Sequence, residues 1–314
     1  MGYQSLLGRL HAGEIVLMDG PTGTELQRRG VSMDPAAWCG PATLGNDDVL
    51  TAIHLDYLRA GSQVITANTF SASRLMLAGA GLAERSGEIA RRAVEAALRA
   101  RDAAPDPSSV VVAGSLSHMV PVSSGTAIVD RTLVPSDSVV AEAFEELASE
   151  LKSAGCDLII LEMMYNPVRV PLAAAAARST GLPVWFGLSA RADRNGQVVA
   201  FEQHEDVGLG LILDLIPAGA IDVAGVMHTP APLIAAAEAQ LRGRFAGPLM
   251  AYPDSGYFEM PDWKFINVIG VAEFEAYCLE WLGVGVQLLG GCCGLTPAHI
   301  EAAARARATF LARR

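Results

Sequence analysis

Eight short β-rich runs alternate with longer amphipathic stretches along the 314 residues, and this alternation predicts an α/β protein of the (β/α)8 TIM-barrel class. Each crossover helix forces the strands on either side of it to run parallel, and eight such units close a barrel. An open doubly wound sheet is disfavoured, because no G-x-G-x-x-G follows the first strand and no G-x-x-x-x-G-K-[ST] occurs anywhere. We expect a single domain over 1–314, since no linker-like segment divides the chain.

The predicted strands are rich in Val, Ile and Leu and end at polar or glycine-rich residues. They are Ile15–Met18, Val64–Thr66, Val110–Ala113, Leu158–Leu161, Val184–Leu188, Ile221–Val226, Pro248–Tyr252 and Val286–Leu289. Between them, Asn46 is expected to cap a helix whose first turn holds two aspartates, and Thr296 with Pro297 to open the last helix. The segment 114–135 is expected to be a long loop, either a lid or a surface excursion.

Composition and charge exclude several classes of protein. The chain has 23 Lys and Arg against 34 Asp and Glu, a formal charge of −11, and no basic cluster that could neutralise a nucleic-acid backbone. The longest apolar stretch, 207–227, is interrupted by two aspartates and a proline, so no membrane span is expected. The first 15 residues include charged side chains where a secretory signal would be apolar, which favours the cytoplasm.

Polar residues follow the predicted strands, where a (β/α)8 barrel places its catalytic groups. Asp19 follows the first strand, Glu162 the fourth and His228 the sixth, while Cys292 and Cys293 follow the eighth. Any one of the acids could simply cap the next helix. Their combination with a histidine and two adjacent cysteines in one inferred ring indicates an active site.

The adjacent cysteines form the most specific local pattern. Three flanking glycines, at 290, 291 and 294, allow a turn tight enough to direct both sulfurs at one point. Two thiolates would supply half of a tetrahedral Zn²⁺ site, and His228 is the candidate third ligand, with a fourth position open as in catalytic zinc sites. The alternatives are a hydrogen-bonded pocket histidine, and for the cysteines two small buried residues or a vicinal disulfide. Cys39, Cys156 and Cys278 are interpreted as structural.

The sequence resembles the zinc-dependent homocysteine S-methyltransferase family over about Leu17 to Ala308. The family motifs D-G-x-x-G-T-E-L, T-x-N-T/S-[FY], Y-P-N-S-G and G-G-C-C correspond here to Asp19–Leu26, Thr66–Phe70, Tyr252–Gly256 and Gly290–Cys293, and the family's glutamate to Glu162. The resemblance implies that Cys292 and Cys293 bind zinc. It also implies that Asp19 and Glu162 are catalytic carboxylates that bind the amino group of homocysteine, with Thr66 and Asn68 in the same substrate pocket.

The resemblance further implies an activity and its partners. The expected reaction moves a methyl group from a small sulfonium or quaternary ammonium donor (S-methylmethionine, S-adenosylmethionine or a betaine) to homocysteine, which gives methionine. The partners are then a small-molecule thiol and a methyl donor, without nucleic acid or membrane, and a homo-oligomer stays open. Two alternatives remain: a methyltransferase of the same fold with another thiol or donor, and a barrel that has lost zinc and acts as a binding protein.

The sequence departs from the family pattern at several site positions. Where the family has G-[VI]-N-C, this chain has Met227 and His228, so an imidazole replaces the third thiolate. Asp254 replaces an asparagine and Met163 a threonine, and Ser-His at 117–118 replaces Gly-Pro. A neutral imidazole would leave the metal centre without the net negative charge of three thiolates. Zinc should then lower the pKa of a bound thiol further and leave its thiolate less nucleophilic.

Overall fold

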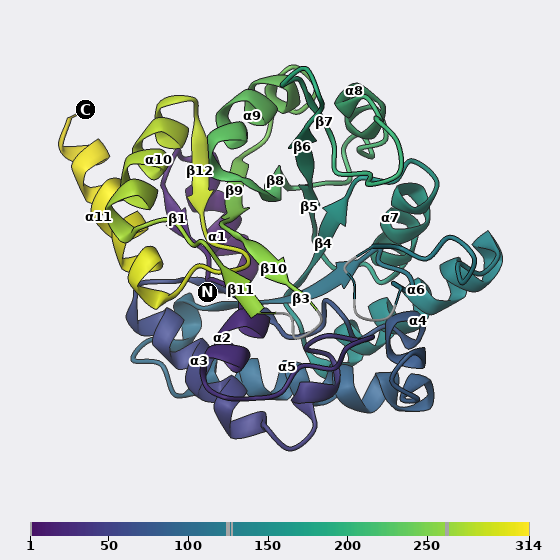
Figure 1. The fold of residues 1–314 in the computed structure, drawn as a ribbon. Coiled ribbons are helices and arrows are strands. Elements are labelled where there is room, and N and C mark those ends of the chain that lie inside the picture. Colours follow the sequence, from purple (N-terminus) through teal and green to yellow (C-terminus); the bar gives the residue numbers. More distant parts are fainter. Residues whose placement is uncertain (1, 124–125, 127, 261–263, 314) are drawn as a thin grey trace.

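The computed structural model describes residues 2–123, 126, 128–260 and 264–313, and its central sheet is a closed barrel of parallel strands (Figure 1). The strand order is β1-β12-β9-β8-β5-β4-β3-β2, and a parallel bridge between Met18 and Val64 joins the two end strands. The barrel strands are β1 (Val16–Leu17), β2 (Val64–Ala67), β3 (Val111–Ser117), β4 (Leu158–Met164), β5 (Val184–Leu188), β8 (Val223–Pro230), β9 (Leu249–Asp254) and β12 (Val286–Leu289). The predicted (β/α)8 fold is confirmed, and each predicted strand overlaps a barrel strand.

Helices surround the barrel, as Figure 1 shows. The α-helices are α1 (Gly2–His11), α2 (Thr22–Arg28), α3 (Asp47–Arg59), α4 (Arg74–Ala78), α5 (Ser86–Asp102), α6 (Asp137–Ala154), α7 (Arg169–Ser179), α8 (Leu209–Leu213), α9 (Ile234–Arg242), α10 (Val271–Gly283) and α11 (Pro297–Ala312). Short 3-10 helices are η1 (Pro41–Thr43), η2 (Ala83–Arg85), η3 (Pro107–Ser109) and η4 (Ala231–Leu233). Among the described residues, no helix combines the length and apolar character needed to cross a membrane.

The helix starts expected at 46 and 296 are correct, but one mechanism is wrong. Asn46 precedes α3, yet its side-chain amide donates to the carbonyl of Ala42 and makes no capping bond to the helix. The two aspartates of the first turn remain to favour the positive helix end. Thr296 precedes α11, and its backbone N–H donates to Nδ1 of His299, so a histidine completes a capping box.

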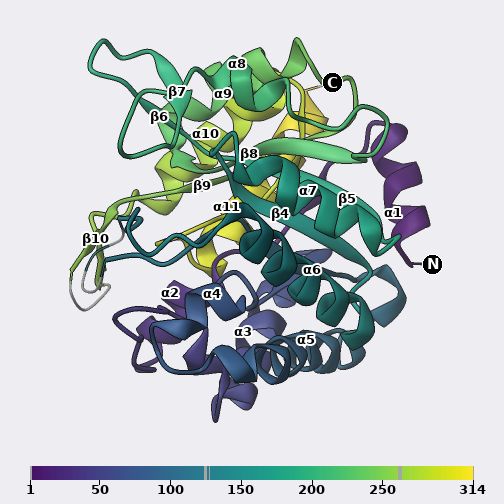
Figure 2. The ribbon, with the colours of Figure 1, turned by 90° about the vertical axis from the view of Figure 1, so that its right-hand side faces the viewer.

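Helices on the outside and side chains on the inside bury the barrel strands on both faces. Every residue of β3, β4 and β5 is buried, which is typical of parallel strands covered by crossover helices. At the N-terminal end of the barrel, the Tyr3 hydroxyl of α1 donates to Asp222, and the Trp185 indole donates to Tyr3. Figure 2 shows α1 and the β10 hairpin at opposite ends of the molecule.

Several strands continue past their predicted ends, and two hairpins extend the C-terminal end of the barrel. Glu162, His228 and Asp254 therefore lie within β4, β8 and β9, where the sequence placed them just after the strands. The third strand likewise reaches Ser117, which shortens the loop expected over 114–135. The hairpins, which the sequence did not predict, are β6 (Ala190–Ala192) with β7 (Val198–Ala200) and β10 (Tyr257–Glu259) with β11 (Lys264–Ile266).

Candidate active site

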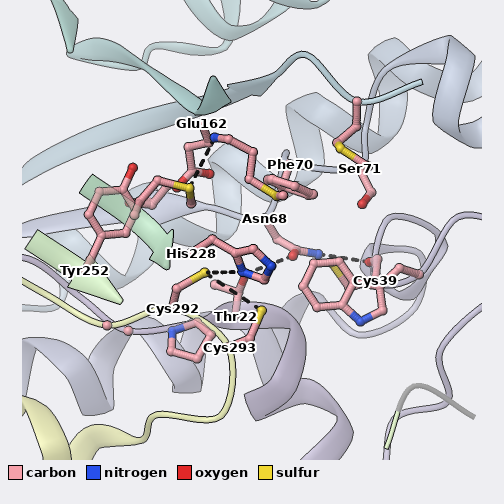
Figure 3. Close-up of a pocket in the computed structure, with 18 of the residues that line it drawn as sticks. Thr22, Cys39, Asn68, Phe70, Ser71, Glu162, His228, Tyr252, Cys292 and Cys293 are labelled. Carbon is pink, nitrogen blue, oxygen red and sulfur yellow. Dashed lines mark hydrogen bonds between the residues drawn. The ribbon is translucent and has the colours of Figure 1, made fainter. Parts of the chain in front are cut away.

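A pocket at the C-terminal end of the barrel contains the predicted site residues. Residues from the segment after β1, from β2, β4, β8 and β9 and from the turn after β12 line it, and Figure 3 shows several of their side chains converging. All seven predicted site residues line this pocket: Asp19, Thr66, Asn68, Glu162, His228, Cys292 and Cys293. The structure therefore brings the seven residues together in one pocket, and their roles there stay predictions.

The turn that carries the two cysteines is hydrogen-bonded to the strands on both sides. The Gly291 N–H donates to the Asp19 carbonyl at 3.0 Å, and the Cys292 N–H donates to the Pro253 carbonyl at 2.7 Å. Gly294 has φ +84°, and a Cβ added there would lie 2.2 Å from the Phe265 ring. Glycine is thus required at 294 both for its backbone conformation and for space.

A β-bulge places His228 at the mouth of the barrel. Met227 pairs with Tyr252 and Pro230 with Asp254, so β8 contains one more residue than β9 over this interval. His228 has φ +41°, a conformation that non-glycine residues rarely adopt and that recurs at functional sites. The Thr229 hydroxyl holds the bulge, because it donates to the Met227 carbonyl and accepts the Ala190 N–H.

The imidazole nitrogen of His228 and the sulfurs of Cys292 and Cys293 lie at the separations expected of ligands in a tetrahedral metal site. Cys292 Sγ is 3.5 Å from His228 Nδ1 and 3.8 Å from Cys293 Sγ, and all three donor atoms lie within 4.8 Å of one another (Figure 3). Ligands on tetrahedral zinc would be about 3.6 Å apart for sulfur and nitrogen and about 3.8 Å apart for two sulfurs. The donor set of His228, Cys292 and Cys293 therefore fits Zn²⁺ in both chemistry and spacing.

Charges around His228 favour its protonated form. Burial opposes protonation, but the Asp254 carboxylate and the Cys292 sulfur raise the pKa of His228 to about 9. Asp254 Oδ2 lies 3.9 Å from Nε2 of His228, and burial raises the pKa of this carboxyl group. The hydrogen bond with Cys293, together with burial, raises the pKa of the Cys292 thiol well above its usual range.

Asp19 is buried and oriented by the neighbouring strand. Its carboxylate accepts the Thr66 N–H at 2.7 Å and the Thr66 hydroxyl at 3.2 Å. Burial raises the pKa of Asp19 well above the usual range, although the bonds from Thr66 oppose this rise. The nearby His54 gives no positive charge, since burial lowers its pKa to about 4.

Glu162 lies at a second bulge. Leu161 pairs with Phe186 and Met164 with Leu188, so β4 contains an extra residue, and Met163 has φ +55°. Ser115 donates a hydrogen bond to the Glu162 carboxylate, and burial raises the pKa of this group. Among the described residues, no lysine or arginine forms an ion pair with Asp19 or Glu162. Within the described part of the chain, the pocket thus holds two buried carboxyl groups without a lysine or arginine partner.

Asn68 lines the pocket, but its amide is engaged with the protein. The amide nitrogen donates to the Cys39 carbonyl and the Thr43 hydroxyl, each at 3.1 Å, and the amide oxygen accepts the Thr22 hydroxyl at 2.9 Å. These bonds hold the 39–43 segment against β2. Direct substrate binding by Asn68 remains a prediction.

Aromatic and methionine side chains form most of the remaining wall, and no sequence pattern indicated them. Trp38 packs edge-on against Phe70 and Phe258, with ring centroids 5.9 and 5.8 Å apart. Tyr165 and Phe201 continue this wall at 5.6 Å. These rings come from separate loops and from strand β10, and they share no sequence spacing that could have indicated a common wall.

Two residues outside the predicted site, Cys39 and His118, have surroundings that the sequence did not indicate. Cys39 is buried as expected of a structural cysteine, but it also lines the pocket, and burial raises the pKa of its thiol to about 12. His118, expected in a long loop, is fully buried directly after β3. Its Nε2 accepts the backbone N–H groups of Tyr165 and Asn166, so it anchors the segment between β4 and α7.

The fold and the pocket together define an α/β-barrel enzyme whose C-terminal end presents two thiols and an imidazole beside two buried carboxyl groups. The family model described as homocysteine S-methyltransferase matches residues 16–307. The chain belongs to the homocysteine S-methyltransferase family, and it is a methyltransferase enzyme.

Individual relatives are similar at low identity over nearly the whole chain. The homocysteine S-methyltransferase of Escherichia coli is 29% identical and covers 92% of this chain and 94% of its own length. The selenocysteine Se-methyltransferase of Brassica oleracea is 26% identical, covering 92% and 88%. The metallated crystal form of the homocysteine methyltransferase from Escherichia coli has a TM-score of 0.71 at 25% identity and covers 95% of this chain and 98% of that one.

Proposed function

We propose that the protein is a zinc-dependent S-methyltransferase that transfers a methyl group to the thiol of homocysteine and produces methionine. The donor is a small sulfonium or quaternary ammonium compound: S-methylmethionine, S-adenosylmethionine or a betaine. The observation that carries this proposal is the convergence of His228, Cys292 and Cys293 in the pocket that holds Asp19 and Glu162. Membership of the homocysteine S-methyltransferase family supports the same reaction.

The proposed metal ligands are His228, Cys292 and Cys293. Two thiolates and a neutral imidazole with an open fourth position form a ligand set known from catalytic zinc enzymes. When bound, Zn²⁺ supplies a Lewis acid that lowers the pKa of a substrate thiol and keeps it as thiolate at neutral pH.

The proposed role of Asp19 and Glu162 is to bind the α-ammonium group of homocysteine. Both groups are buried without a lysine or arginine partner among the described residues, so an incoming ammonium would supply the missing positive charge. Asp19 is already oriented by its two hydrogen bonds from Thr66, which reduces the cost of ordering the site on binding.

The aromatic wall is the proposed binding surface for the methyl donor. Trp38, Phe70 and Phe258 line the pocket, and the faces of aromatic rings attract sulfonium or quaternary ammonium cations. In the transfer step, a lone pair of the thiolate sulfur forms the new bond to the methyl carbon. The bond from that carbon to the donor heteroatom breaks, and its electron pair stays on the donor, which leaves as a neutral molecule. No general acid is needed for such a leaving group.

A methyltransferase with a different thiol acceptor is the second candidate. Met163 and Met227 both line the pocket at positions where the chain departs from the family pattern, so the space around the acceptor differs. A relative from Brassica oleracea is a selenocysteine Se-methyltransferase, which shows that selenium acceptors occur among similar proteins.

An acceptor and donor screen on zinc-loaded protein tests the proposal. Homocysteine, cysteine and selenocysteine would each be combined with S-methylmethionine, S-adenosylmethionine and glycine betaine, and methylated products measured by mass spectrometry. We expect the highest kcat/KM with homocysteine. A higher kcat/KM for another acceptor would establish the second candidate, and zinc-bound protein inactive with every pair would contradict both.

A further inference from the structure

We propose that Asp254 is a positioning residue that orients the His228 imidazole toward the metal position. This inference rests on the proposed zinc site and concerns a residue that does not touch the metal itself. His228 Nδ1 faces the Cys292 sulfur at 3.5 Å, while Nε2 faces Asp254 Oδ2 at 3.9 Å. The two nitrogens of the ring thus face different partners: Nδ1 faces Cys292, and Nε2 faces Asp254 on β9.

The backbone of Asp254 is held in place relative to the cysteines. Asp254 lies between Pro253, whose carbonyl accepts the Cys292 N–H, and Ser255, whose N–H donates to the Cys293 carbonyl. The Ser255 hydroxyl also accepts the Ile269 N–H at 2.6 Å. Backbone bonds on both sides therefore fix Asp254 in the same framework as the Cys292–Cys293 turn.

The backbone of His228 and the packing of its ring do not by themselves select which ring nitrogen faces the cysteines. His228 lies in the β8 bulge at φ +41°, and its ring makes a T-shaped contact with Phe201 at a centroid distance of 5.3 Å. These contacts restrict the ring position, but a ring flip would still exchange Nδ1 and Nε2. A carboxylate that accepts a hydrogen bond from the Nε2–H group selects one flip state and one tautomer of the ring. In that state the lone pair of Nδ1 points toward the two cysteine sulfurs.

The chemistry of the pair matches a general arrangement of metal sites. A metal-binding histidine usually donates its second N–H to a carboxylate or carbonyl, and loss of that partner lowers metal affinity by about 10- to 100-fold. Asp254 is 14% exposed, as is His228, and among the described residues its carboxylate has no other ion-pair partner. The proposed hydrogen bond requires the Nε2 to Oδ2 distance, 3.9 Å here, to shorten to about 3 Å when the metal is bound.

Zinc affinity in a double-mutant cycle tests the inference. The dissociation constant for Zn²⁺ is measured by chelator competition in wild type, Asp254→Ala, His228→Cys and the double variant. We expect Asp254→Ala to weaken zinc binding by about 10- to 100-fold in wild type and to leave affinity unchanged or tighter in His228→Cys, where no imidazole remains to be oriented. Asp214→Ala, at an exposed aspartate paired with Arg244, is the matched control and should have no effect.

Two further measurements keep the result unambiguous. Asp254→Asn preserves side-chain size and an acceptor oxygen, so its loss should be smaller than that of Asp254→Ala. Visible spectra of Co²⁺-loaded Asp254→Ala should retain tetrahedral coordination by two thiolates and one imidazole, because the ligands themselves are intact. Equal losses in both backgrounds, or no loss in wild type, would overturn the positioning role. A wild type that binds no zinc would instead overturn the proposed metal site and this inference with it.

Discussion

The backbone N–H of Met163 donates a hydrogen bond to the sulfur of Met227 at 3.2 Å. Met163 is the left-handed residue of the β4 bulge beside Glu162, and Met227 precedes the β8 bulge that carries His228. The Ser189 hydroxyl donates to the same sulfur at 3.1 Å. One methionine side chain therefore links the strands that present a carboxylate and an imidazole to the pocket.

Replacement of Met227 by leucine should destabilise the protein. Volume is nearly conserved, but the buried Met163 N–H and the Ser189 hydroxyl lose their acceptor, at a cost of about 1–3 kcal/mol in the free energy of unfolding. Urea denaturation measures the difference. Met250→Leu is the matched control, because Met250 is a buried methionine of β9 whose sulfur accepts no hydrogen bond from the described residues. Equal losses for the two variants would contradict the role of the Met227 sulfur.

Removal of the imidazole should abolish zinc binding, whereas a third thiol should preserve it. We expect less than one tenth of an equivalent of zinc in His228→Ala, because two protein ligands hold zinc poorly, and a full equivalent in His228→Cys. Metal analysis after dialysis against a weak chelator makes the measurement. Cys156→Ala, at a buried cysteine far from the site in the fold, serves as the control. Full zinc retention by His228→Ala would show that His228 is no ligand.

Neutralisation of either buried acid should weaken binding of the amino group of homocysteine. Asp19→Asn and Glu162→Gln keep the shape of the side chain but lose its charge, so we expect KM for homocysteine to rise about 10- to 100-fold, which corresponds to a lost charged hydrogen bond. The control is a substrate, 4-mercaptobutanoate, which has the thiol but no amino group. Its KM should be unchanged by either substitution; an equal rise for both thiols would mean that the carboxylates act on something else.

His54 should make the protein less stable as the pH falls. Burial lowers the pKa of this side chain to about 4 from its ordinary value of 6.5. The unfolded chain therefore binds a proton below pH 6.5 that the folded protein takes up only near pH 4, and the free energy of unfolding decreases across that window. For His54 alone the decrease between pH 7 and pH 5 is about 2 kcal/mol. Urea unfolding of His54→Gln should lack this component, and an identical pH dependence in both proteins would contradict it.

Much of the candidate site could be predicted because its residues lie next to strands. Parallel strands of a barrel end at the same face, so Asp19 after β1 and Cys292 after β12 had to meet once the strand pattern was correct. The glycine-rich turn at 290–294 indicated close backbone packing, and the contact a Cβ at Gly294 would make with Phe265 gives the reason. The bounds of β4 and β8 could not be predicted, since alternation along one strand does not reveal an extra residue relative to its neighbour.

The aromatic wall was equally hidden in the sequence. Trp38 and Phe258 belong to segments more than 200 residues apart, yet their ring centroids lie 5.8 Å apart. The wall forms only where the loop before α3 and the β10–β11 hairpin meet over the barrel mouth (Figure 1). Such contacts depend on loop conformations, which local propensity does not determine.

The sequence by itself determined the (β/α)8 barrel, the chain order of its strands and the identity of the polar residues at their ends, because these follow from local patterns of apolar and turn-forming residues. Only the tertiary structure decided how those residues face one another. The bulges at Met163 and His228 arise from the register between neighbouring strands, and that register turns Glu162 and His228 toward the pocket. The pairing of Asp254 with His228 has the same origin: it joins two strands whose relative offset depends on contacts across the whole barrel.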